Sequence, residues 1–182
     1  MNLWSLRHPP VDRQGRCIGQ TPIATTDPTS ESVRQVVACA PFVPKRLFSS
    51  DLPRCADLAA GLAAHWKIPL ERAPALREMS FGEWEGRSYD DIDSTDGSRW
   101  RAWCDDWRFG TPPGGESVDD LMARVSAWIA KHTPSEVDLL VTHAGVVRAL
   151  RVLSGETWED AISAQCPFLG WQEHRIVSPL TG

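Results

Sequence analysis

The stretch Leu3-Trp4-Ser5-Leu6-Arg7-His8-Pro9-Pro10 opens the chain and decides how the rest of it is interpreted. A short apolar run ends in an arginine and a histidine, and the prolines then stop the strand because proline fixes φ and has no N–H to donate. A second apolar run, residues 138–141, leads in the same way to Thr142-His143-Ala144-Gly145. Ligands of α/β sheets collect at the carboxyl ends of strands, so we expect His8 and His143 to meet in space.

Strands and helices are predicted to alternate along the chain. Apolar runs indicate strands at 3–6, 46–49 and 138–141, and apolar residues at helical spacing indicate helices near 33–37, over 53–66, from 116 to about 132, and over 145–153. Ser30 and Ser32 are candidate N-caps for the first helix, and residues 168–177 are expected to form two short edge strands. The alternation predicts an α/β fold, a three-layer sandwich with a mostly parallel central sheet.

The length of 182 residues suits one well-buried core, and we expect residues 1–182 to form a single domain. One segment, about 83–115, is polar, rich in tryptophan and longer than an ordinary connection, and we expect an irregular insertion there. Four of the nine tryptophans lie in this span. Packing is the favoured interpretation of that cluster, and a lid over an organic substrate is the alternative.

Composition excludes several classes of partner. The formal net charge of −5 provides no general basic field, so neither nucleic acid nor a membrane surface is expected to bind. The first apolar run is too short for a signal peptide or a membrane span, and the five cysteines include no Cys-x-x-Cys pair that would indicate a zinc site or a disulfide framework. We therefore expect a cytoplasmic protein with reduced cysteines, and the sequence does not indicate an oligomeric state.

Arginine beside strand-end histidine suggests phosphate chemistry. Cleavage of a phosphomonoester needs a nucleophile, cations for the phosphate oxygens and an acid for the leaving alkoxide. His8 could accept the phosphoryl group as neutral imidazole, Arg7 and Arg54 could bind phosphate oxygens, and His143 could donate a hydrogen bond to them. Gly145 fits a helix entry whose N–H groups also attract phosphate. A lone strand-end histidine is more often structural, so the interpretation depends on these residues acting together.

Two glutamates are candidates for the acid. Glu78 and Glu83 lie in a segment with apolar residues and glycines that can hold a carboxyl group partly out of water, which favours its protonated form. Most glutamates are solvated surface acids, and without the other motifs that interpretation would hold for both.

Five segments together resemble the histidine phosphatase superfamily, the phosphoglycerate mutase-like clan, over residues 3 to about 153. They are Leu6-Arg7-His8, Ser49-Ser50-Asp51-Leu52-Pro53-Arg54, Glu78-Met79-Ser80-Phe81-Gly82-Glu83-Trp84-Glu85-Gly86, Gly114-Gly115-Glu116-Ser117 and Val141-Thr142-His143-Ala144-Gly145. The resemblance implies that His8 is the phosphorylated nucleophile, that Arg7, Arg54 and His143 bind phosphate, and that Glu78 transfers the proton, with Glu83 as second choice. It implies no metal and no cofactor.

Within the clan, three features look most like the α-ribazole phosphatase branch: the segment from Glu78 to Gly86, the motif Gly114-Gly115-Glu116-Ser117 and the loop Cys17-Ile18-Gly19-Gln20. The resemblance thus implies a phosphatase for a small phosphorylated metabolite, with α-ribazole phosphate as a candidate. A phosphoglycerate mutase-type phosphotransferase is an alternative, but the chain lacks the longer insertions expected of it.

The chain departs from the family pattern in two places. The family usually continues Arg-His-Gly, whereas two prolines follow His8 here, and the helix entry pattern is poorly kept over residues 21–32. The prolines remove two backbone donors near the phosphate and favour an extended backbone at His8. They raise the alternative of a degenerate member that binds a phosphorylated ligand or a partner protein without turnover.

Other phosphatase chemistries fail on spacing. No arginine stands six places after any cysteine, as a cysteine phosphatase would need. Asp91-Ile92-Asp93 has the spacing of an aspartyl phosphatase but follows no apolar strand, and the chain has neither a Gly-x-Ser-x-Gly segment nor a Gly-Lys-Ser/Thr loop.

Overall fold

A computed structural model describes residues 2–133 and 137–177 of the chain. Its central sheet has the strand order β3-β2-β4-β1-β5. The strands are β1 (Asn2–Arg7), β2 (Arg46–Ser49), β3 (Leu70–Arg72), β4 (Asp138–Thr142) and β5 (Trp171–Arg175). All neighbouring pairs are parallel except β1 and β5, which are antiparallel. The predicted α/β fold class with a mostly parallel sheet is confirmed.

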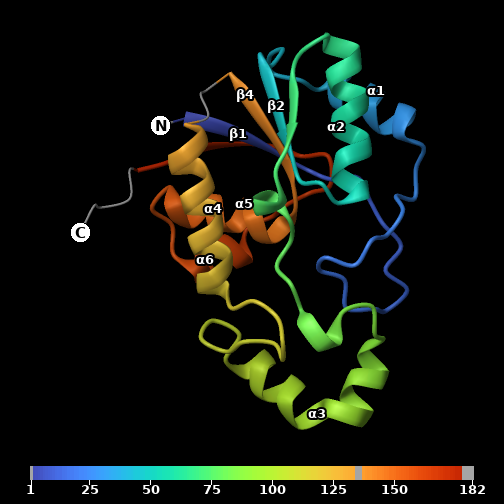
Figure 1. The fold of residues 1–182 in the computed structure, drawn as a ribbon, viewed down its shortest axis with the longest axis vertical. Coiled ribbons are helices and arrows are strands. Elements are labelled where there is room, and N and C mark those ends of the chain that lie inside the picture. The colour runs from blue at the N-terminus through green and yellow to red at the C-terminus, as the bar shows by residue number, and fades with distance from the viewer. Residues whose placement is uncertain (1, 134–136, 178–182) are drawn as a thin grey trace.

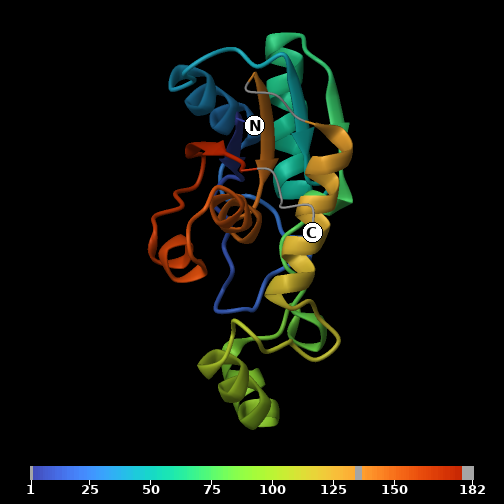
Figure 2. The same cartoon turned by 90° about the vertical axis from the view of Figure 1, so that its left-hand side faces the viewer.

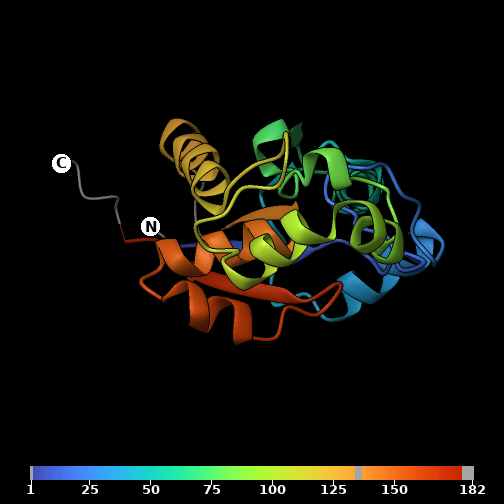
Figure 3. The same ribbon diagram turned by 90° about the horizontal axis from the view of Figure 1, so that it is seen from below.

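Helices cover both faces of this sheet (Figures 1 and 3). On one side lie α1 (Thr29–Ala38) and α2 (Pro53–Trp66), whose apolar residues form one core cluster with the strands. On the other side lie α4 (Val118–His132), α5 (Ala144–Leu153) and α6 (Trp158–Ser163), which form a second cluster. Alternate residues of one strand serve the two cores, as Leu3 and Leu6 of β1 do, because successive strand side chains point to opposite faces.

The pairing of β1 with β4 brings the two histidines together. Arg7 is in register with Thr142, so the next residues, His8 and His143, lie beside each other at the carboxyl ends of parallel strands. The His8 backbone N–H donates to the Thr142 carbonyl oxygen at 2.9 Å, which extends the ladder by one step. Ser50 follows β2 at the same edge, where its N–H donates to Val141 O at 3.0 Å.

The prediction of an irregular insertion over 83–115 is wrong in part, because this span contains α3 (Tyr89–Asp105). The 3₁₀ turn η2 (Gly82–Trp84) precedes it, and another, η1 (Pro74–Leu76), follows β3. Helix α3 escapes sequence analysis because its first half is polar and Asp96 breaks the helical φ/ψ within it. Figure 2 shows α3 at one end of the molecule, clear of the sheet.

Smaller corrections concern the ends of elements. The two edge strands expected over 168–177 are the single strand β5, and α1 begins after Pro28 without a side-chain cap, so neither Ser30 nor Ser32 is the N-cap. The three-residue strand β3 and the six-residue helix α6 were not predicted. No helix in the described ranges combines the length and apolar character needed to cross a membrane.

Candidate active site

His8 is buried directly after β1, with 2 % of its surface exposed. Its Nδ1 lies 2.7 Å from the Pro9 carbonyl oxygen. A carbonyl oxygen can only accept, so Nδ1 carries the proton and Nε2 of the neutral ring has a free lone pair. Burial, followed by the charge of Arg54, lowers the pKa of His8 to about 3, so the ring stays neutral at physiological pH.

His143 caps α5 and faces His8 with ring centroids 5.1 Å apart. Arg54 donates its Nε–H to His143 Nδ1 at 3.2 Å, so the proton of the neutral ring is on Nε2, which donates to Ser50 Oγ at 2.9 Å. Burial and then Arg54 lower the pKa of His143 well below its usual value. The two histidines therefore hold opposite tautomers, with an acceptor nitrogen on His8 and a donor nitrogen on His143.

Arg54 is held by the loop that follows β1. Its two terminal nitrogens donate to the carbonyl oxygens of Gly19 and Thr21, the latter at 3.1 Å. Glu85 binds the same loop, since its carboxylate accepts hydrogen bonds from the backbone N–H of Gly19 at 3.1 Å and from that of Gln20 at 2.7 Å. Glu85 thus supports the arginine that orients His143.

Glu78 is buried beside the start of α5, with 8 % of its surface exposed. Its carboxylate accepts from the N–H of Gly145 at 3.1 and 3.2 Å and of Met79 at 3.0 Å. The Gly145 N–H therefore serves Glu78 here, whereas sequence analysis expected it to attract phosphate. Arg124 fixes the backbone of Glu78 by donating to its carbonyl oxygen at 3.0 Å, and Glu116 binds Arg124 at 2.7 Å.

Glu83, the second candidate for the acid, has a different environment. Its side chain is 58 % exposed and pairs with Arg99 of α3 at 3.1 Å. Among the described residues, the lining of the cavity beside Glu78 includes Arg7 but not Glu83, and it does not include His8, Arg54 or His143 either. The geometry therefore favours Glu78.

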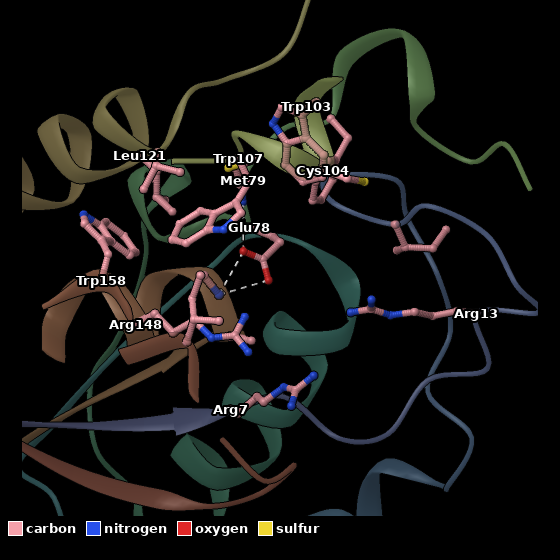
Figure 4. A pocket seen from close by; sticks show the side chains of 16 residues that line it. Arg7, Arg13, Glu78, Met79, Trp103, Cys104, Trp107, Leu121, Arg148 and Trp158 are labelled. Carbon is pink, nitrogen blue, oxygen red and sulfur yellow. Dashed lines mark hydrogen bonds between the residues drawn. The ribbon is translucent and has the colours of Figure 1, made fainter. Parts of the chain in front are cut away.

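A cavity of about 470 Å³ opens beside Glu78. Arg7, Arg13 and Arg148 point into it from three sides (Figure 4). Its lining also includes an aromatic wall, which consists of Phe81, Trp103, Trp107 and Trp158. The cavity can thus accept an anion at one end and a ring or apolar group at the other.

The tryptophan cluster divides between the two interpretations. Trp84 is fully buried and packs edge-to-face on Trp100, at 5.0 Å between centroids, so these two serve packing. Trp103 packs on Trp84, with 5.9 Å between ring centroids, and it also lines the cavity. Trp107 lines the cavity too.

The two prolines after His8 have backbone carbonyls that act as acceptors. Pro9 O accepts from the His8 ring, and Pro10 O accepts from the Thr26 N–H at 3.0 Å. Pro9 and Pro10 therefore lack backbone N–H donors, but a backbone carbonyl still orients the His8 ring.

Several residues of the site were not found in the sequence. Cys55 Sγ lies 3.4 Å from His143 Nε2, Arg7 donates to the Cys166 carbonyl oxygen, and Phe168 stacks on Arg7 at 3.8 Å. Cys55 follows Arg54 directly in the first turn of α2, and this position next to a candidate phosphate-binding arginine could have indicated that it lies near the site. The other two partners depend on where the chain returns before β5, and no local pattern indicates them.

Comparison with known proteins identifies the family of this chain. The model of the histidine phosphatase superfamily (branch 1) matches residues 3–166. The chain is 27 % identical over 179 residues to an adenosylcobalamin/α-ribazole phosphatase of Salmonella typhimurium, covering 91 % of this chain and 88 % of the relative. It is 32 % identical over 140 residues to a glucosyl-3-phosphoglycerate phosphatase of Mycolicibacterium vanbaalenii, covering 69 % and 61 %.

The fold also matches a solved structure. The crystal structure of the α-ribazole phosphatase from Shigella flexneri superposes with a TM-score of 0.84 at 23 % identity, over 98 % of this chain and 96 % of that one. By the family match over residues 3–166, this chain belongs to the histidine phosphatase superfamily, as its motifs predicted.

Proposed function

We propose that this chain hydrolyses phosphomonoesters of small metabolites through a phosphohistidine intermediate on His8. The observation that carries the proposal is the pair of opposite tautomers, since His8 is oriented by the Pro9 carbonyl as a neutral nucleophile beside a histidine that donates. Activity is favoured over the degenerate alternative because, with two prolines after it, the His8 ring is still oriented by a backbone carbonyl, that of Pro9.

The proposed reaction has two steps. In the first, His8 Nε2 attacks phosphorus, the bond from phosphorus to the ester oxygen breaks, and protonated Glu78 gives its proton to the departing alkoxide. In the second, Glu78 takes a proton from water, the water oxygen attacks phosphorus, the P–N bond breaks, and inorganic phosphate leaves. Arg7 and Arg54 stabilise the charge on the equatorial oxygens in both steps, and His143 joins them by turning its Nε2–H from Ser50 Oγ to a phosphate oxygen.

The substrate class follows from the cavity and the relatives. The cationic end, lined by Arg7, Arg13 and Arg148, would hold the phosphate, and the aromatic wall would hold the leaving group. α-Ribazole phosphate is the first candidate, because relatives carry that activity in their names and the wall suits an aromatic base. Five free cysteines fit a reducing compartment, and we propose the cytoplasm.

The test compares the protein with His8→Ala on an aryl phosphate in the presence of a chelator. We expect steady release of phosphate by the wild-type protein and loss of nearly all of it in the variant. Cys39→Ala, an exposed cysteine outside the site, serves as the control and should match wild type. Equal release by wild type and His8→Ala would refute the mechanism, and no release by wild type would refute the activity.

A further inference from the structure

The turn between α6 and β5 lies against Arg7 and has strained geometry. Leu169 adopts φ +56°, in the left-handed region that non-glycine residues rarely enter. A Cβ on Gly170 would stand 2.6 Å from Pro167 Cγ, so glycine is required for the close approach. Strain of this kind is retained where the surrounding structure enforces it, often at functional sites. The family match ends at residue 166, just before this turn.

The turn contacts both the backbone and the side chain of Arg7. The Leu169 N–H donates to Arg7 O at 3.0 Å, and the Arg7 guanidinium donates to Cys166 O. The ring of Phe168 lies 3.8 Å from the Arg7 guanidinium carbon and 5.5 Å from the His8 ring. Phe168 is 36 % exposed, a large apolar ring at the surface whose inner face covers a cation.

We propose that Phe168 is a positioning residue that holds Arg7 for phosphate binding, a role that depends on the function proposed above. Contact with the face of the Phe168 ring restrains the guanidinium, and the N–H groups that do not donate to Cys166 O remain for an anion. The restraint matters here because Pro9 and Pro10 provide no backbone N–H near the phosphate, so more of the binding falls to Arg7.

Two variants separate the stacking from simple packing. Phe168→Leu keeps apolar volume and removes the π face, whereas Phe168→Tyr keeps both. We expect the dissociation constant of inorganic phosphate, measured by calorimetry, to rise about fivefold in Phe168→Leu and to return to near the wild-type value in Phe168→Tyr. In the aryl phosphatase assay KM should rise with the dissociation constant.

Phe109→Leu is the matched control. Phe109 also covers an arginine, since Arg108 Cζ lies 5.0 Å from its ring centroid, but Phe109 is 75 % exposed and absent from the described lining of the cavity. This variant should bind phosphate as wild type does.

A double-mutant cycle with Arg7→Lys decides whether Phe168 acts through Arg7. Lysine keeps the charge and lacks the planar face, so Phe168→Leu should weaken phosphate binding far less in this background. Unchanged phosphate affinity in Phe168→Leu, failure of Phe168→Tyr to restore it, or an equal loss in the Arg7→Lys background would overturn the proposal. If phosphate binding depends on Phe168 but the wild-type protein shows no turnover, only the proposed function is refuted and the role of Phe168 stands.

Discussion

Substitution of Gly145 by alanine tests the placement of Glu78. A Cβ at position 145 would stand 2.1 Å from Glu78 Oε1 and 3.3 Å from its Cδ. The contact must open to at least 3 Å, so the carboxyl group would move by about 1 Å and lose its two hydrogen bonds from the Gly145 N–H. Misplacement of a reacting group by about 1 Å can cost about 10²-fold in rate.

The assay is kcat/KM on two substrates. For an alkyl phosphate, whose leaving group needs a proton, we expect Gly145→Ala to lower kcat/KM by about 10²-fold. For p-nitrophenyl phosphate, whose leaving group departs without one, the loss should be several-fold smaller. The fold should persist, because alanine is the better helix former.

Gly97→Ala provides the matched control. It lies in α3, and its Cβ would meet only the flexible ends of Arg101 and Asp93 at 3.0–3.1 Å. It should keep wild-type kinetics. Equal losses on the two substrates in a folded Gly145→Ala, or no loss on either, would contradict the placement of Glu78 as the acid.

Glu78→Gln should lower kcat/KM for alkyl phosphates by about 10²-fold or more while Glu83→Gln stays near wild type, and the reverse result in steady-state kinetics would move the acid to Glu83. The free energy of unfolding should fall as pH drops below 6.5. The pKa values of folded His8 and His174 are lowered to about 3 and about 4, so in this range the unfolded chain binds protons at these residues and the folded chain does not. Urea unfolding at two pH values checks this, and a rise in stability on acidification would refute it. Trp107→Ala should raise KM for ring-bearing phosphomonoesters about three- to tenfold and leave KM for glycerol phosphate nearly unchanged, and equal changes for both would remove Trp107 from substrate binding.

Sequence periodicity located the elements with a continuous apolar face. Leu121, Val125 and Trp128 identify α4, and the apolar runs identify β1, β2 and β4. Helix α3 was missed because its first half is mostly polar and Asp96 breaks the helical φ/ψ within it. Strand β3 has only three residues and pairs with β2 alone, so its sequence holds too few positions for a pattern.

The residue types of the proposed site were visible in the sequence, but their orientation was not. His8 and His143 follow apolar runs, and parallel strand ends meet, so their proximity could be predicted. The tautomers could not, because they depend on the Pro9 carbonyl and on Arg54, whose positions are set by tertiary structure. The role of Phe168 depends on a turn formed by distant pairing with β1.

The proposed covalent bond between phosphorus and His8 can be observed by trapping the phosphorylated enzyme. The protein is mixed with substrate, quenched in base during turnover, and digested for mass spectrometry. We expect acid-labile, base-stable phosphate on His8, absent from His8→Ala. Phosphate found only on other residues of an active enzyme would contradict it.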